Sequence, residues 1–432
     1  MKCMQRFKEL EPKLIYIWSL VLVVWASFLL YALLPGKWGI WIYTNSDTLY
    51  LASIFRDLFI DKSGISGWHL NAAPNFFPEM LIYFPIMALL KGTAASNMAF
   101  GLVNMTLVLI LLNLFLRTLD PGLSLSRLSL FNLLFLCYPL SSVLGEGQII
   151  PSQFLLPGYH AGQLINTLLA GICFFRYLRN RQLRDLLGMA LVTALATLSD
   201  KLFLMAFVAP VSGYSLLHIV LRKDARMQLK VLASTLLSAA CGLLLFRTIS
   251  NLKEITFIST SWKMFYFVRI DEAFLALLRH FRSVLISFPL QGFLIMLALL
   301  FIPAAAFHLL YYGKAFSTGR MSPFETRSYR LLLFLLIQVV GVLFTPVING
   351  TYMGAAHIRY NYVALLMGDM GLLYLILTKI PGTRTLKRYT PPLLGAFVLI
   401  LSIILIGKGR DRSEERFADF VPESSLVLDS LQ

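Results

Sequence analysis

Long apolar runs separated by short polar segments constrain this chain more than any other feature. About eleven such runs occur, most of them close to 20 residues long. A helix of about 20 residues crosses the ~30 Å hydrocarbon core of a bilayer, and in that core each backbone polar group must bond within its own segment. The sequence therefore predicts an all-α polytopic membrane protein with about 11 transmembrane helices. The predicted spans are residues 14–34, 97–116, 128–144, 162–178, 186–199, 202–221, 230–249, 288–312, 331–347, 361–379 and 391–407.

Composition excludes the main alternatives to this fold class. The 432 residues are 58% hydrophobic and only 14% charged, whereas about a quarter of the residues in a soluble domain are charged. A membrane β-barrel would show ten-residue segments of alternating polarity, and the runs do not alternate. The four cysteines have no spacing typical of a metal site or a disulfide framework.

The net charge of +16 raises the question of nucleic-acid binding, and its distribution answers it. With a cytoplasmic N-terminus, the predicted inner loops hold 22 of the 38 Lys and Arg residues, whereas acidic and basic residues nearly balance on the outer face. Cytoplasmic loops of membrane proteins carry this excess of positive charge. The distribution predicts a cytoplasmic N-terminus, a C-terminus outside and no nucleic-acid partner.

The outer segments differ strongly in length. Residues 35–96 form the longest outer loop, and we expect interfacial or re-entrant helices in it. The polytopic domain is predicted over residues 1–410, and residues 411–432 form a short non-cytoplasmic tail. No internal repeat is visible.

The first outer loop contains two candidate helices and two acids. A helix is predicted to begin near Asp47, because the preceding Asn and Ser can cap free backbone N–H groups and apolar residues follow at helical spacing. Such a helix can lie in the membrane interface. Phe77-Pro78-Glu79 then precedes the apolar segment 80–90, which is only half as long as a span. We interpret it as a re-entrant or interfacial helix; an ordinary short span is the alternative.

Further polar residues recur on the predicted outer side. They are Glu146, His160, Lys201, His357 and Arg359. A single basic residue or histidine at an interface usually serves as an anchor. Their recurrence at one depth on one face favours a shared polar cavity.

The order of these features resembles the GT-C superfamily of polyprenyl-phosphate-sugar-dependent glycosyltransferases, closest to the branch containing aminoarabinose and protein mannosyl transferases. The similar motifs are the acid after the first span in residues 45–52, Phe77-Pro78-Glu79 before its helix, residues 199–203, and the late Arg359-Tyr360 pair. Glu79 stands where the family motif has its second proline.

The resemblance implies transfer of a sugar from a polyprenyl-phosphate donor to a lipid or glycan acceptor at the outer face of a bacterial inner membrane. Asp47 would be the catalytic base. The residues implied in substrate binding are Lys201 and Arg359 for the phosphate, with Tyr360, Glu79, Glu146, His160 and His357 around them. Some members of the superfamily use a divalent metal, but no ligand set is convincing in this sequence.

Two other classes of function stay open from the residues alone. A transporter would carry polar groups near the membrane midplane, and Asp369 is the one acid expected deep in a predicted span, with Gln338 at similar depth as its partner. A non-catalytic membrane component of a cell-envelope complex is the second alternative.

Overall fold

The computed structural model describes residues 46–64, 67–144, 156–257, 269–287, 289–350, 352 and 361–379. Each predicted span within these residues coincides with a helix. The helices are α5 (Thr93–Leu119), α6 (Leu125–Leu144), α7 (Ala161–Asn180), α8 (Leu183–Ser199), the π-helix η5 (Leu204–Val208) that continues into α9 (Ala209–Val220), α10 (Ala225–Ser250), α12 (Pro289–Ser317), α13 (Pro323–Ile348) and α14 (Tyr362–Lys379). The predicted spans 14–34 and 391–407 and the predicted tail lie outside the described residues.

Five of these helices are long and apolar enough to cross a membrane. They are α5, α7, α10, α12 and α13. The chain is therefore a mostly helical integral membrane protein, as predicted. The helices α8 and α14 have 17 and 18 residues, and η5 with α9 forms a shorter apolar helix.

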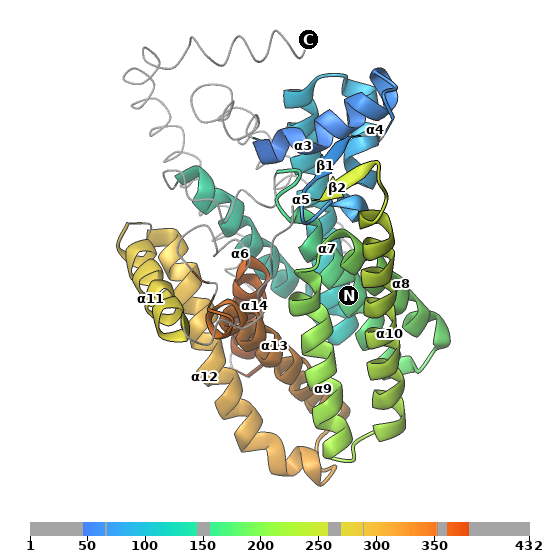
Figure 1. Cartoon of the computed structure of the whole chain (residues 1–432). Helices are drawn as coiled ribbons and strands as arrows, with labels where there is room; N and C mark the ends of the chain where they lie inside the picture. Colours follow the sequence, from blue (N-terminus) through green and yellow to red (C-terminus); the bar gives the residue numbers. More distant parts are fainter. Residues whose placement is uncertain are drawn as a thin grey trace, which may run out of the picture.

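The first predicted outer loop folds onto one end of the bundle, which we call the α3 end (Figure 1). Its elements are α3 (Ser46–Phe55), the π-helix η2 (Arg56–Ile60), β1 (Trp68–Leu70), the π-helix η3 (Phe76–Met80) and α4 (Leu81–Leu90). The helix predicted near Asp47 is thus confirmed, and its apolar residues Leu51, Ile54 and Phe55 are buried. The strand β1 pairs in parallel with β2 (Ile255–Phe257), which joins this loop to the segment after α10.

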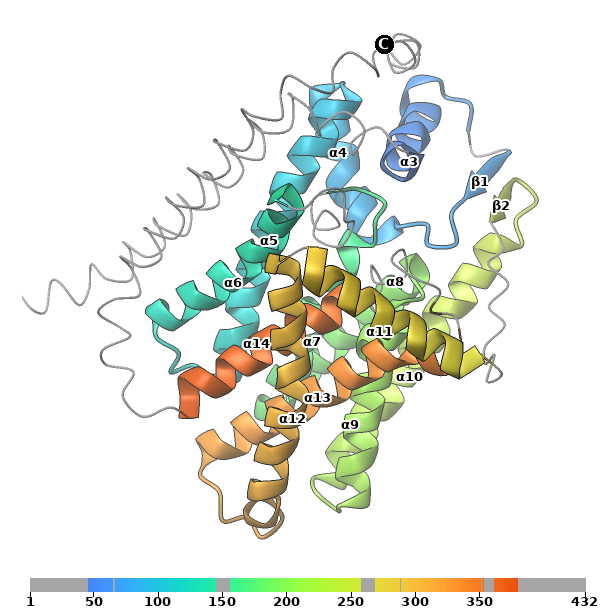
Figure 2. The same ribbon diagram turned by 90° about the vertical axis from the view of Figure 1, so that its left-hand side faces the viewer.

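The opposite end of the bundle is held together by ion pairs. Asp224, in the α9–α10 turn, accepts hydrogen bonds from Arg181 at 3.1 Å and from Arg330 at 2.9 Å. Lys223 donates to the carbonyl of Ser317 at 2.8 Å. The α7–α8, α9–α10 and α12–α13 turns, which the charge pattern assigned to one side of the membrane, therefore lie together (Figure 2).

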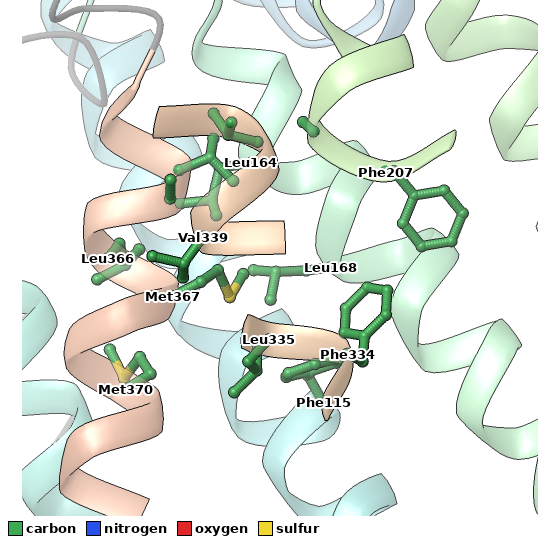
Figure 3. Packing of buried hydrophobic residues seen from close by; sticks show 14 of the residues in the cluster. Phe115, Leu164, Leu168, Phe207, Phe334, Leu335, Val339, Leu366, Met367 and Met370 are labelled. Carbon is green, nitrogen blue, oxygen red and sulfur yellow. The ribbon is translucent and has the colours of Figure 1, made fainter. Parts of the chain in front are cut away.

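Large apolar side chains from five elements meet in the core. Figure 3 shows Phe115 of α5, Leu168 of α7, Phe207 of η5, Phe334 of α13 and Met367 of α14 around one another. The ring of Phe334 also lies 5.4 Å from that of Phe175 in an edge-on arrangement. This packing sets α7, α13 and α14 against one another and so fixes the ends that carry the polar residues.

Asp369 is buried in α14, as predicted, but its partner differs from the prediction. The hydroxyl of Tyr138, on α6, donates to Asp369 Oδ2 at 2.7 Å. Gln338 instead donates to the backbone carbonyl of Ala206 at 2.7 Å. The expected pairing of Asp369 with Gln338 is wrong because the Gln338 amide donates to a backbone carbonyl in the middle of the π-helix η5.

Among the described residues, one helix was not predicted. The segment 250–287 contains α11 (Ile270–Ser287), which buries Ala273, Leu277, Phe281 and Val284. Figure 2 shows α11 running obliquely across the bundle, and it contacts α12 and α13. Its apolar spacing is helical, but its charged residues make it too polar for a span.

Candidate functional site

The centre of the site is the short segment between Gly158 and Gly162, where α7 begins. Glu79 Oε2 accepts a hydrogen bond from Gly158 N at 2.8 Å, and Oε1 accepts one from Gly162 N at 2.9 Å. The first N–H groups of a helix lack intrahelical partners, so Glu79 caps α7 from another segment of the chain. Glu79 is only 2% exposed.

The environment of Glu79 shifts its protonation. Burial raises the pKa of Glu79 to about 7, although the hydrogen bonds from Gly162 and Gly158 and the nearby His160 act in the opposite direction. Asp200 adds a smaller effect that raises it further. Glu79 lies in η3, outside the candidate spans, and changes its charge near neutral pH.

His160 and Asp200 form a close pair beside this cap. His160 Nδ1 lies 2.6 Å from Asp200 Oδ2, with side-chain exposures of 15% and 8%. Asp200 follows the last residue of α8, and its Oδ1 accepts a hydrogen bond from Leu202 N at 2.9 Å. Both oxygens of Asp200 are thus engaged.

The start of α14 reaches the same place. The hydroxyl of Tyr362 donates to the backbone carbonyl of His160 at 2.7 Å, and Tyr362 is fully buried. Tyr362 follows the predicted Arg359-Tyr360 pair by two residues. The chain therefore brings the beginning of its last described helix to the segment that carries His160.

Asp47 also belongs to this neighbourhood. A Cβ atom added to Gly158 would collide with the backbone carbonyl of Asp47. Gly158 has φ +82°, a conformation that glycine adopts without steric cost. The backbone of the predicted base Asp47 and the carboxylate of Glu79 therefore both lie against the short stretch of backbone that carries His160.

The loop before η3 is fastened to the end of α8. Asn75 N donates to the carbonyl of Ser199 at 3.2 Å, and Phe77 N donates to Ser199 Oγ at 2.7 Å. Asn166, one turn into α7, donates to the carbonyl of Phe77 at 3.3 Å. These bonds hold the segment that carries Glu79 next to Asp200 and His160.

Lys201 lies next to the site in sequence, but its ammonium has a different neighbour. Lys201 Nζ lies 3.9 Å from the centroid of the Phe246 ring on α10, within the range of a cation–π interaction. Burial lowers the pKa of Lys201. Its role as a phosphate ligand stays a prediction.

Four predicted site residues lie outside the described residues. They are Glu146, His357, Arg359 and Tyr360. Within the described ranges, no group of three His, Cys, Asp or Glu side chains is placed to hold a metal ion. Both oxygens of Glu79 already accept backbone hydrogen bonds.

Sequence reasoning did not select Asp200, Ser199 or Tyr362. A signal for Asp200 was present, because it forms a polar pair with Lys201 between two apolar runs. Ser199 and Tyr362 act through hydrogen bonds to distant backbone groups, and such contacts leave no pattern in a sequence.

Comparisons with known proteins do not identify the family of this chain. No protein-family model, curated protein or solved structure matches the chain. The function must therefore be inferred from the residues and their arrangement.

Proposed function

We propose that the chain is a membrane glycosyltransferase that moves a sugar from a polyprenyl-phosphate donor to a lipid or glycan acceptor at the outer face of the membrane. The observation that supports this proposal is the gathering of Asp47, Glu79, His160 and Asp200 at the α3 end, opposite the basic turns around Asp224. If the basic end is cytoplasmic, this group of acids and histidine faces outward.

The finer architecture belongs to the same proposal. It comprises about eleven membrane-spanning helices in a GT-C-like arrangement, a cytoplasmic N-terminus and an outer C-terminus in a bacterial plasma membrane. The pairing of β1 with β2 supports it, because it places the segment after α10 on the same end as the first loop.

The chemistry of transfer requires a base for the acceptor and positive charge for the departing phosphate. Asp47 is the proposed base. Arg359 can meet a phosphate through its planar guanidinium, and it precedes Tyr362, which bonds to His160, by three residues.

The decisive test is transfer by the purified full-length chain in lipid nanodiscs with a panel of tritiated undecaprenyl-phosphate sugars, together with envelope-glycan analysis with and without the protein. Asp47→Asn should lower transfer by about 10²–10⁴-fold, the usual cost of losing a positioned base. Its thermal midpoint should change little, because Asp47 lies in the first turn of α3 and the loss of an acidic charge there costs about 0.3–1 kcal/mol.

Asp57→Asn is the matched control, since Asp57 lies on the same N-terminal stretch, in η2. It should retain full transfer. Normal transfer by Asp47→Asn would remove Asp47 from the mechanism, and absence of transfer with every donor would reject the enzyme.

One observation favours a transporter as the second candidate. The pair of Asp369 and Tyr138 is buried between helices of the bundle, and ionisable groups inside membrane proteins often serve transport. Uptake of a substrate by proteoliposomes, lost in Asp369→Asn and without glycosyl transfer, would support this candidate.

A further inference from the structure

The helix α11 is amphipathic and packs against the bundle on one side only. Its buried residues recur at helical spacing and form a stripe, and the helix contacts α12 and α13. The members of this stripe are Ala273, Leu277, His280, Phe281 and Val284. Five large apolar side chains of the same helix stay between 39% and 70% exposed: Phe274, Leu275, Leu278, Leu285 and Ile286. Much apolar surface of α11 is therefore left for a partner outside the described chain.

The exposed side chains are ordered around the helix axis. At about 100° per residue, Phe274, Leu278 and Leu285 lie beside the buried stripe and widen its apolar surface. Arg279 and Arg282 follow on the side that faces away from the stripe. They are three residues apart, so their side chains are neighbours on the helix surface. A wide apolar surface next to arginines is typical of a helix that lies in the membrane interface.

The contacts of α11 place it far from the end of the bundle that holds Asp224. α12 begins two residues after α11 ends, and its 29 residues extend about 43 Å to the turn at the Asp224 end. A Cβ atom added to Gly292, in the first turn of α12, would lie 2.7 Å from Leu285 Cα, so the two helices meet without room for a side chain. The ring of His280 lies 6.5 Å from that of Tyr352, which follows α13. Figure 2 shows α11 crossing the bundle obliquely from the start of α12.

The charges on the outward side of α11 indicate what it meets. Arg279 and Arg282 are exposed, and among the described residues neither has a carboxylate within ion-pair distance. By contrast, Arg269, just before α11, lies 4.0 Å from Glu272. A planar guanidinium binds a phosphate through two parallel hydrogen bonds. Two such groups beside exposed apolar side chains complement a lipid that has acyl chains and a negative headgroup.

We propose that α11 lies in the membrane interface and binds an anionic glycerophospholipid of the phosphatidylglycerol type. Arg279 and Arg282 hold its phosphodiester, and Phe274, Leu278 and Leu285 contact an acyl chain. This lipid site is independent of the proposed transferase, because α11 carries none of the residues assigned to that activity.

Native mass spectrometry of the full-length chain, released from detergent micelles, tests the proposal by counting bound lipid molecules. Dioleoyl-phosphatidylglycerol is titrated in parallel with dioleoyl-phosphatidylcholine, which has the same acyl chains and phosphodiester but no net charge. The variant combines Arg279→Gln with Arg282→Gln. The matched control combines Arg222→Gln with Arg226→Gln, which removes the same charge from exposed arginines at the Asp224 end.

We expect the Arg279→Gln, Arg282→Gln variant to bind phosphatidylglycerol at least about tenfold more weakly at its tightest site, the typical effect of losing a hydrogen bond to a charged group. Phosphatidylcholine binding should hardly change, and the control should keep the tight site. Arg279→Lys with Arg282→Lys keeps both charges but not the planar fork, so its affinity should be intermediate. Leu278→Asn should weaken the binding of both lipids, because an acyl contact is lost.

Equal affinity of the wild type and the glutamine variant for phosphatidylglycerol would overturn the proposal. So would an equal loss in the control, because binding would then follow net charge and not α11. A two-chain species that dissociates in Leu278→Asn and does not depend on lipid would assign this face to a second copy of the chain. Unfolding midpoints in SDS should be unchanged for the arginine variants, because both side chains are exposed. If the glutamine variant unfolds early, the lysine variant supplies the comparison, and wild-type affinity in it would overturn the arginine contact.

Discussion

The Glu79→Gln substitution perturbs one side chain that has two opposing roles in the site. Its carboxylate accepts two backbone hydrogen bonds, from Gly158 and Gly162. It is also nearly fully buried, and burial penalises its charged form. The variant is isosteric and removes the charge, so stability measured against pH separates the two roles.

The magnitude follows from the shift of its pKa from 4.5 to about 7. Because the folded pKa lies above the unfolded one, the native state holds the proton more tightly. The stabilisation is fully present below pH 4.5 and is lost as the pH rises towards 7. At about 1.4 kcal/mol per pKa unit, the wild type should lose about 3 kcal/mol over this window, and Glu79→Gln should lack this component.

A second effect is independent of pH. The new amide group places an N–H₂ where one backbone N–H had an acceptor, and a buried unsatisfied donor costs about 1–3 kcal/mol. The variant should therefore be about 2 kcal/mol less stable than the wild type at pH 5. Because the wild type loses about 2.5 kcal/mol of this stabilisation between pH 5 and pH 8, the difference should vanish or change sign by pH 8.

Unfolding by SDS in mixed micelles, followed by tryptophan fluorescence between pH 4.5 and 8, measures both effects. The exposed Glu272 on α11 provides the control, and Glu272→Gln should follow the wild type throughout. Parallel curves for wild type and Glu79→Gln would refute the argument. They would mean that water or a local opening relieves the burial of Glu79.

Three further predictions test the packing and the topology. Gly158→Ala should destabilise the chain by about 2 kcal/mol or more, because its Cβ would collide with the Asp47 carbonyl at a positive φ; the unfolding midpoint checks this. Tyr138→Phe should cost about 1–3 kcal/mol by removing a donor from the buried Asp369, whereas Asp369→Asn keeps the acceptor and should cost less; the same unfolding assay compares them. Alkaline phosphatase fused after Gln432 should be active, whereas a fluorescent and phosphatase-silent fusion would contradict an outer C-terminus.

The helices could be predicted because their causes are local. Residues 162–178 and 230–249 are apolar runs of span length, and α7 and α10 cover them with one to five additional residues at each end. The end at Asp224 could be predicted for the same reason, since loop charges show which turns share a side. The helix α11 has apolar residues at helical spacing, but its charges removed it from a search based on span length.

The sequence predicted only some of the site residues, because the hydrogen bonds of the site connect distant segments. Glu79 and Gly162 are 83 residues apart in sequence, and His160 and Tyr362 are 202 residues apart. The ionisable side chains of Glu79 and His160 made them candidate site residues. The sequence could not show that Glu79 caps a helix or that His160 pairs with Asp200. Those roles depend on how α7, α8 and α14 pack, and that packing depends on many apolar contacts acting together.

The cap formed by Glu79 limits how this site can bind a phosphate. A helix N-terminus is often a phosphate site because its N–H groups are unpaired, and α7 begins at the centre of this one. Here Gly162 N donates to Glu79, and Gln163 N donates to the carbonyl of His160. A phosphate could reach Gly162 N only by displacing a carboxylate that also accepts from Gly158 N. In the proposed transferase, positive side chains would therefore bind the donor phosphate, and Lys201 and Arg359 are the residues predicted for this role.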